Sequence, residues 1–241
     1  MPRFYCPLPL TPGLVVDLPE AVAHHLHVVR QQAGARLTLF NGDGGQYSAT
    51  LQEVGKRRAS ALVEAFQAVD VELPYAITLA QALPEASKMD WIIEKAVELG
   101  VGGIAPLAAQ RCVVRLAGER AEKRQVHWQG IIVAASEQSG RNRLAHLAPL
   151  QDVADWNRQQ DLHKRILLTP RADQSLAAWA GSQPPQALTI MVGPEGGFSE
   201  AEEQAALAAG AIGLAMGPRI LRTETAGLTA LATLNALWGG M

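Results

Sequence analysis

The chain has 241 residues, of which 48% are hydrophobic and 18% are charged, and its formal net charge is -2. This composition is typical of a folded protein with a substantial core, and it excludes a largely disordered chain. The length allows one large domain or two smaller ones. Because the net charge is close to zero, any surface that binds nucleic acid has to be a local patch.

The few cysteines and histidines indicate no metal site. Cys6 and Cys112 have no metal-ligand spacing, so we expect reduced thiols. The histidines at 24, 25 and 27 are spaced too closely to converge on a tetrahedral ion. The proline-rich start does not resemble a signal peptide, and no apolar run is long enough to cross a bilayer. We therefore expect a cytoplasmic protein with no membrane partner.

The first part of the chain, residues 1 to about 72, reads as a small antiparallel β-barrel. Strands are predicted at 14–18, 36–40, 46–54 and 59–63, with a helix over 20–30. The run Asn41 to Gly45 is a strong turn signal between two of these strands. Charge, a proline and a change of pattern coincide at Val71 to Pro74, so we place a domain boundary there. The predicted domains are 1–72 and 73–241.

Beyond this boundary, strands alternate with helices. Ala76 to Ala80 and Val101 to Leu107 are buried strand candidates. Between them, Lys88 to Val101 has an apolar face at helical spacing, with Gly100 as a natural stop. The alternation predicts a parallel sheet.

Residues 111–143 form the most basic region of the chain and its best candidate for an RNA surface. Trp128 is the only aromatic residue there, so contacts to the RNA backbone are expected more than base stacking. Ser136 to Arg141 is polar, and it fits either contact with a substrate or a helix end stopped by Gly140. The charged residues of the region are Arg111, Arg115, Glu119, Arg120, Glu122, Lys123, Arg124, Glu137, Arg141 and Arg143.

Three apolar runs near the end of the chain each lead into a loop, at 168–172, 193–199 and 216–222. Loops at the carboxyl ends of parallel strands are where such sheets bind ligands. Ser199 and Glu202 form a capping-box pattern, and Thr223 is the predicted cap of a last helix that runs to about Trp238. No phosphate-binding glycine motif is present, and Glu195 places negative charge in the second loop. A cofactor without phosphates, such as S-adenosylmethionine, therefore fits best.

Two of these loops carry a family resemblance. GPEGGFSEAE at 193–202 together with GPRILRTETA at 217–226 resembles the RsmE family of 16S ribosomal RNA uridine-N3 methyltransferases, in the SPOUT class. Residues 24–30, 40–45 and 134–141, and Lys88 with 98–101, are similar to further parts of the family pattern. Met216 departs from the family's usual leucine, which is a near-equivalent apolar side chain.

The resemblance implies an α/β fold: a parallel sheet with helices on both faces and a C-terminal trefoil knot, preceded by a PUA-like RNA-binding barrel. It implies S-adenosylmethionine as the cofactor. The implied reaction is the methylation of uracil N3 in 16S ribosomal RNA, within the small ribosomal subunit. It also implies a homodimer with its sites near the interface. The cofactor-binding residues carried over are Leu168, Thr169, Pro170, Gly193, Glu195, Gly196, Gly197, Met216, Gly217, Ile220, Leu221, Arg222, Thr223 and Thr225.

The chemistry suggests further roles. Uracil N3 loses its proton only well above neutral pH, so a base and a stabilising cation are useful. Arg222, and Arg141 from a partner subunit, are the candidate cations, and Glu224 or Glu137 is the candidate base. Glu224 is also explained as a carboxylate at a helix start. The candidate RNA-binding residues are Arg3, Arg30, Lys88, Arg111, Arg115 and Arg219. A solvated face explains Arg3 and Arg30 equally well, and a surface lysine at a helix start is the better explanation for Lys88.

Two other functions stay open from the sequence. One is a SPOUT methyltransferase that acts on a ribose 2′-OH or on another base. The other is a non-catalytic RNA-binding assembly factor. The product nucleoside distinguishes the first, and a failure to bind S-adenosylmethionine would support the second.

Overall fold

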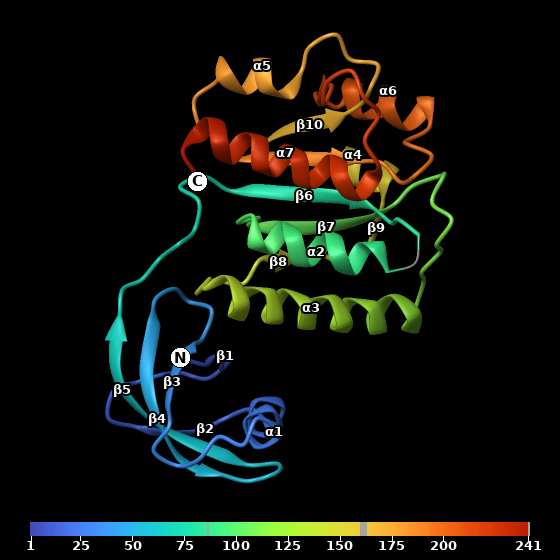
Figure 1. The fold of residues 1–241 in the computed structure, drawn as a ribbon. Coiled ribbons are helices and arrows are strands. Elements are labelled where there is room, and N and C mark those ends of the chain that lie inside the picture. The colour runs from blue at the N-terminus through green and yellow to red at the C-terminus, as the bar shows by residue number, and fades with distance from the viewer. Residues whose placement is uncertain (86, 160–162, 241) are drawn as a thin grey trace. The chain divides into compact units, whose positions relative to one another are not determined.

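The structure is a computed structural model that describes residues 1–85, 87–159 and 163–240 (Figure 1). The chain divides into two compact units. The first consists of residues 1–72 and 136–144, and the second of residues 73–135 and 145–241. The short segment 136–144 thus belongs to the N-terminal unit, although the predicted boundary would assign it to the second domain.

The first unit is built on a five-stranded sheet in the order β1-β3-β4-β5-β2. All neighbouring pairs are antiparallel except β1, which runs parallel to β3. A buried apolar cluster that includes Leu26, Leu37 and Leu51 forms its core. The elements are β1 (Arg3–Tyr5), β2 (Val15–Asp17), α1 (Glu20–Val28), β3 (Arg36–Phe40), β4 (Gln46–Val54) and β5 (Ala59–Gln67).

The second unit contains a parallel sheet in the order β12-β10-β11-β6-β7-β8, with β9 also pairing with β7. The central strand β11 is buried at every position, as expected for a strand covered on both faces. The strands are β6 (Ile77–Ala82), β7 (Gly103–Ala108), β8 (His146–Leu147), β9 (Gln151–Asp152), β10 (Lys164–Leu168), β11 (Leu188–Val192) and β12 (Ile212–Leu214).

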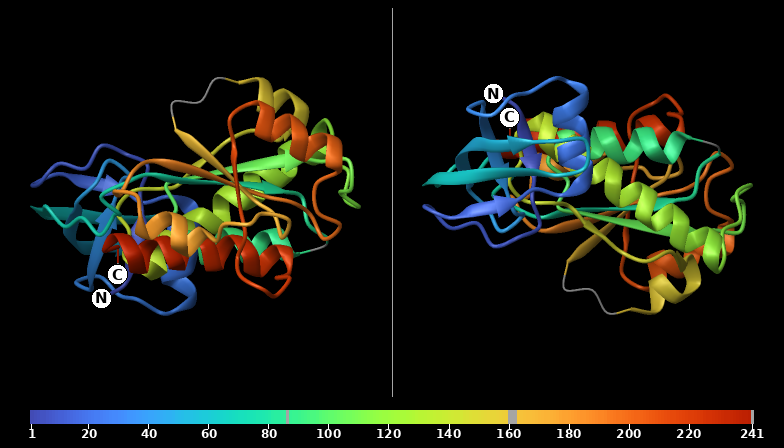
Figure 2. Two further views of the ribbon diagram at one scale, coloured as in Figure 1. Left: turned by 90° about the horizontal axis from the view of Figure 1, so that it is seen from above. Right: turned by 90° about the horizontal axis from the view of Figure 1, so that it is seen from below.

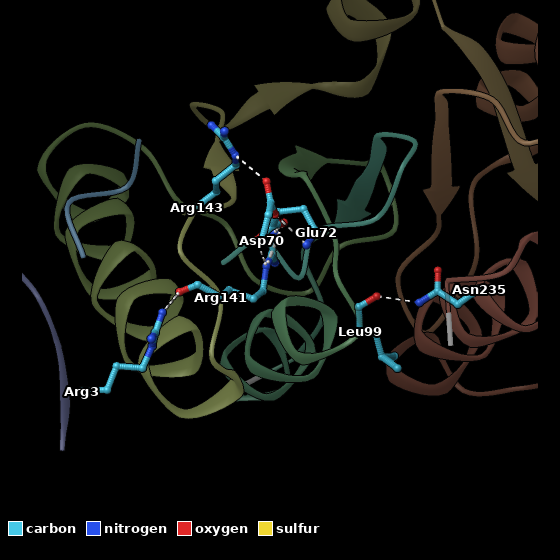
Figure 3. A network of polar contacts seen from close by, with 7 residues as sticks. All are labelled: Arg3, Asp70, Glu72, Leu99, Arg141, Arg143 and Asn235. Carbon is cyan, nitrogen blue, oxygen red and sulfur yellow. Dashed lines mark hydrogen bonds and ion pairs between the residues drawn. The ribbon is translucent and has the colours of Figure 1, made fainter. Parts of the chain in front are cut away.

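Helices cover both faces of this parallel sheet, as Figure 2 shows. Helix α7 packs against α2 and α5 on one face, while α4 and α6 contact each other on the opposite face. Asn235 of α7 donates a hydrogen bond to the Leu99 carbonyl after α2, at 2.7 Å (Figure 3). The trefoil knot stays a prediction. The helices are α2 (Lys88–Glu98), α3 (Glu119–Ser139), α4 (Val153–Arg158), α5 (Leu176–Gly181), α6 (Glu200–Ala208) and α7 (Thr223–Trp238).

Helix α3 occupies much of the basic region and continues from the second unit into the first. In the second unit, Trp128 donates its ring N–H to Asp90 of α2 at 3.1 Å. Gly140 ends the helix with a φ of +81°, a conformation that glycine adopts without strain. The helix-stop interpretation of Gly140 therefore agrees with the structure.

The segment 136–144 is held in the first unit by a polar network (Figure 3). Arg3 donates to the Arg141 carbonyl at 2.9 Å, and the Glu137 carboxylate accepts from the Tyr5 backbone N–H at 2.8 Å. The Arg141 guanidinium forms an ion pair with Glu72, and its side chain is only 4% exposed. The network binds this segment to β1 and to the chain that follows β5.

In the part of the chain that the structure describes, no helix combines the length and the apolar character needed to span a bilayer.

Candidate functional site

The loops that follow β10, β11 and β12 enclose a pocket of about 490 Å³ in the second unit. This volume lies within the range typical of small-molecule sites. The pocket is lined by Lys88, Arg111, Leu168, Thr169, Pro170, Arg171, Val192, Gly193, Pro194, Glu195, Gly196, Gly197, Phe198, Glu203, Met216, Gly217, Arg219, Ile220, Leu221, Arg222, Thr223, Glu224 and Ala226.

The glycines of the 193–199 loop allow its backbone to fold tightly on itself. A β-carbon on Gly193 would lie 2.8 Å from the Phe198 backbone nitrogen, a distance that excludes any side chain there. Gly197 has a φ of +67°, in the left-handed region that favours glycine. The loop therefore presents backbone groups to the pocket at close range.

The start of α7 is tied to the same loop. The Thr223 hydroxyl donates to the Gly193 carbonyl at 2.6 Å and accepts from Gln81 Nε2 at 2.9 Å. The prediction that Thr223 caps α7 is wrong: the N-cap residue is Arg222, and the Thr223 hydroxyl is used across the pocket wall instead. Fully buried Gln81, at the end of β6, holds that hydroxyl in place.

The capping box at the start of α6 is confirmed. Ser199 accepts from the Glu202 backbone N–H, and Glu202 Oε2 accepts from the Ser199 backbone N–H at 2.8 Å. The other oxygen of Glu202 accepts from the Gln110 backbone N–H at 2.7 Å. One carboxylate thus fixes both the helix start and the chain that follows β7.

Lys88 and Glu195 form an ion pair on the pocket wall, with Nζ and Oε1 2.6 Å apart. The same carboxylate oxygen accepts from the Glu85 backbone N–H at 3.0 Å. Burial alone would raise the pKa of Glu195, but the bonds from Lys88 and Glu85 outweigh it and hold the pKa below its ordinary value. The Glu195 bond is in turn the main reason why the pKa of Lys88 is raised.

The five cations on the pocket wall differ in their partners. Arg171 forms an ion pair with Glu203 at 2.6 Å, and Arg111 donates to backbone carbonyls of the 193–199 loop. Lys88 is engaged by Glu195. The exposed side chains of Arg219 and Arg222 have no hydrogen bond or ion pair to any residue that the structure describes. These two guanidinium groups are therefore the ones available to a ligand.

Glu224, in the first turn of α7, places a buried acceptor beside the free arginines. Its Oε2 atom is buried and has no hydrogen-bond partner among the described residues. A buried carboxylate oxygen without a partner is energetically unfavourable. It is the kind of group that a bound ligand completes.

The structure brings most of the predicted site residues together. All predicted cofactor residues line the pocket except Thr225, which is exposed on α7. Ile220 is 86% exposed at the rim, so it does not form an apolar wall as Met216 and Leu221 do. The lining residues that the sequence did not predict, most of them direct neighbours of predicted ones, are Arg171, Val192, Pro194, Phe198, Glu203 and Ala226.

The residues predicted for catalysis and RNA contact separate into two groups. Arg222, Glu224, Lys88, Arg111 and Arg219 line the pocket. Of the described residues outside the pocket lining, Arg3 and Arg141 belong to the polar network of the first unit, Arg30 ends α1, and Arg115 donates to backbone carbonyls near β7. Within this chain the Arg141 guanidinium is engaged by Glu72 and its side chain is only 4% exposed, so its expected catalytic role in a partner subunit stays a prediction.

The fold and this pocket define an α/β domain that binds a small ligand at the carboxyl ends of its parallel strands. Comparison with known families identifies it further. The RNA methyltransferase domain model matches residues 71–235, and the model of the RNA methyltransferase PUA domain matches residues 18–64. The chain therefore belongs to the RNA methyltransferase family.

Within this family the chain resembles the members named ribosomal RNA small subunit methyltransferase E. The Bacillus subtilis protein of that name is 34% identical over 90% of this chain and 87% of its own length. One from Buchnera aphidicola subsp. Schizaphis graminum is 28% identical over 100% of this chain and 98% of its own length. A crystal structure from Neisseria gonorrhoeae, bound to S-adenosylmethionine, has a TM-score of 0.91, is 39% identical, and matches 99% of this chain and 98% of that one.

Proposed function

We propose that this protein transfers a methyl group from S-adenosylmethionine to N3 of a uridine in the 16S ribosomal RNA of the small ribosomal subunit. The observation that carries the proposal is the pocket at the strand ends, where unpaired Arg222 faces a ligand site that also contains the unpartnered Glu224 oxygen. Similar chains named small-subunit methyltransferases, one of them solved with this cofactor, support it.

The pocket residues fit S-adenosylmethionine. The tight backbone of the 193–199 loop offers N–H and C=O groups to the edge of an adenine, and Leu168, Met216 and Leu221 supply apolar contacts. The carboxylate of Glu195 is already balanced by Lys88, so on this part of the wall Glu224 is the carboxylate that partly offsets the positive charge of the cofactor. The cofactor, when bound, supplies a methyl group already activated by its sulfonium.

The protein has to handle the proton and the charge of the uracil. We assign Glu224 to accept the N3 proton and Arg222 to stabilise the negative charge that spreads over O2 and O4 as this proton leaves. The methyl group then bonds to N3 as its bond to sulfur breaks, which leaves a neutral thioether. Because N3 lies on the pairing edge of uracil, the base has to be unpaired to react.

We further infer the setting of the reaction. Arg219 at the pocket and Arg30 in the N-terminal unit are the proposed contacts to RNA phosphates. Lys88, which was also predicted, is engaged by Glu195 and would have to leave that ion pair to reach a phosphate. The protein is proposed to be a cytoplasmic homodimer that carries a C-terminal trefoil knot. Family membership supports these inferences.

The test is mass spectrometry of 16S ribosomal RNA from cells with and without the gene. We expect N3-methyluridine to disappear in its absence and to return with the wild-type gene. A 2′-O-methylated nucleoside or another base would indicate a different methyltransferase. If no methylated nucleoside disappears and calorimetry shows no cofactor binding, the protein is an assembly factor.

For Arg222→Ala and Glu224→Gln, we expect turnover to fall by roughly 100-fold or more, because each removes a group that acts in the transition state. Cofactor affinity from calorimetry should change only a few-fold. Arg158→Ala, at an exposed arginine of α4 outside the pocket, is the control and should retain full turnover. Normal turnover at saturation in Arg222→Ala would contradict its assigned role.

A further inference from the structure

We propose that Arg111 and Arg115 are positioning residues for the 193–199 loop, and not the RNA contacts that the sequence suggested. They hold this loop in its ligand-binding shape before the ligand arrives. The inference rests on the proposed function, because the ligand concerned is the cofactor of that reaction.

Arg111 holds the loop through two of its backbone carbonyls. Its Nη1 atom donates to the Gly196 carbonyl at 2.9 Å and to the Phe198 carbonyl at 3.3 Å. These carbonyls flank Gly197, the residue with left-handed backbone geometry. A β-carbon on Gly196 would lie 3.4 Å from the Arg111 stem, so the stem also packs directly on the loop backbone. Arg111 thus fixes the loop by hydrogen bonds and by contact.

Arg111 is itself held by a turn that follows β7. The Cys112 N–H closes this turn on the Ala109 carbonyl at 3.1 Å. Arg115 donates to the Ala109 carbonyl at 3.2 Å and to the Gln110 carbonyl at 2.7 Å. On its other side, the Gln110 N–H is bound by Glu202 of α6. The turn is therefore anchored on both sides and presents Arg111 to the loop.

This geometry distinguishes the two arginines from Arg219. Arg111 and Arg115 direct donors at backbone carbonyls, whereas the Arg219 side chain makes no hydrogen bond or ion pair with the rest of the described chain. A loop fixed in advance loses less conformational entropy when it binds its ligand. The affinity for the cofactor should therefore depend on Arg111, while the affinity for RNA should depend on Arg219.

The experiment compares full-length wild-type protein with Arg111→Met, Arg111→Lys, Arg115→Met and Arg219→Met. Methionine keeps an unbranched stem and removes the donors. Calorimetry gives the Kd for S-adenosylmethionine, and binding of a 16S ribosomal RNA transcript across salt concentrations gives the number of phosphate contacts. Hydrogen exchange of residues 193–199 without cofactor reports the order of the loop itself.

We expect Arg111→Met to raise the cofactor Kd by roughly 10- to 100-fold and to speed amide exchange in the loop, with the salt slope unchanged. Arg111→Lys, which keeps the charge and one donor, should lie between this variant and wild type. Arg115→Met should show a smaller effect in the same direction. Arg219→Met should lower the salt slope by about one. Its cofactor Kd should rise less than that of Arg111→Met, and its loop exchange should stay as in wild type.

The inference is overturned if Arg111→Met lowers the salt slope as Arg219→Met does, or leaves both the cofactor Kd and the loop exchange within twofold of wild type. If Arg111→Met does not fold, Arg111→Lys and Arg115→Met decide by the same criteria. Failure of the proposed function looks different: wild-type protein would yield no N3-methyluridine. In that case, hydrogen exchange of residues 193–199 measured without cofactor would still test whether Arg111 orders this loop.

Discussion

Arg30 ends α1 in a left-handed backbone conformation, with a φ of 57°. Glycine is the usual residue there, because a side chain in this conformation contacts the following backbone unfavourably. Arg30 was predicted, and is proposed, to bind RNA phosphates. A strained backbone at Arg30, where glycine would be unstrained, supports a functional role for the arginine side chain.

For Arg30→Gly, we expect the N-terminal unit to be more stable by about 1 kcal/mol, because the strain is removed. Arg30→Ala should show no such gain, since alanine keeps the β-carbon. Both variants lose the charge, so both should lower the salt slope of RNA binding by about one. Thermal unfolding and the same RNA assay check these outcomes. Equal stability of the two variants would contradict the strain argument.

At the scale of elements, the sequence predicted best where a turn or cap marks both ends. The bounds of β3 and β4 agree with the predicted ranges, and α7 ends at Trp238 as predicted but begins one residue earlier than predicted. Strand β5 was predicted to end at Val63 but continues to Gln67. The prediction stopped early because the last four residues are all exposed, so they show no alternation of buried and exposed positions. Strand β1 was not predicted, since it is three residues long and lies among prolines.

The site follows the same rule. The ligand loops were predictable because their glycines, arginines and strand ends are local features. The contact of Arg111 with the 193–199 loop was not predictable, because Arg111 and Gly196 are 85 positions apart. In addition, an arginine in a basic region is easily interpreted as an RNA contact. Unlike a glycine turn, a side chain's partner across the fold leaves no mark in the neighbouring sequence.

Helix α3 is anchored to β1 through Glu137, and this contact should make stability depend on pH. Burial raises the pKa of Glu137, and the Tyr5 N–H, His25 and Arg3 offset this only in part. The folded state therefore holds this proton over a pH range in which the unfolded chain has lost it. The contribution of Glu137 to stability is therefore fully present below the ordinary pKa of a glutamate, and it is lost as the pH rises through the pKa of Glu137 in the folded state.

For Glu137→Gln, we expect this fall to disappear, because glutamine can still accept from Tyr5 but does not ionise. The melting temperature near neutral pH should rise by roughly 1–3 °C. Calorimetric scans from about pH 4 to pH 8 measure both effects. A variant that is less stable at neutral pH, with an unchanged pH profile, would show that attraction to Arg3 outweighs burial.

At the scale of the whole molecule, the N-terminal unit is discontinuous. Segment 136–144 supplies the partners of Arg3, of the Tyr5 N–H and of Glu72. Without it, Arg3 keeps its bond to Gln46, but the Tyr5 N–H and Glu72 lose these partners to water. Each lost hydrogen bond removes about 0.5–1.5 kcal/mol of net stabilisation. The unit as residues 1–72 alone is therefore incomplete.

We expect an isolated 1–72 fragment to be at best partly folded, with poor dispersion in its NMR spectrum. A fusion of 1–72 to 136–144 through a flexible linker of about 15 residues should recover a cooperative thermal transition. The same fusion with Arg141→Ala is the control and should recover little. A well-dispersed spectrum from 1–72 alone, with the same melting temperature as the fusion, would refute this.

The discontinuity also sets an order of events during synthesis. Residues 1–72 emerge from the translating ribosome before the segment that completes them, and 72 further residues must be added to reach position 144. At about 5–20 residues per second, this takes roughly 4–14 s. For that interval the nascent unit lacks the partners that segment 136–144 supplies to the Tyr5 N–H and to the carboxylate of Glu72. Chaperones that bind incompletely folded chains should meet the protein in this window, and slow codons between positions 72 and 144 should lengthen it.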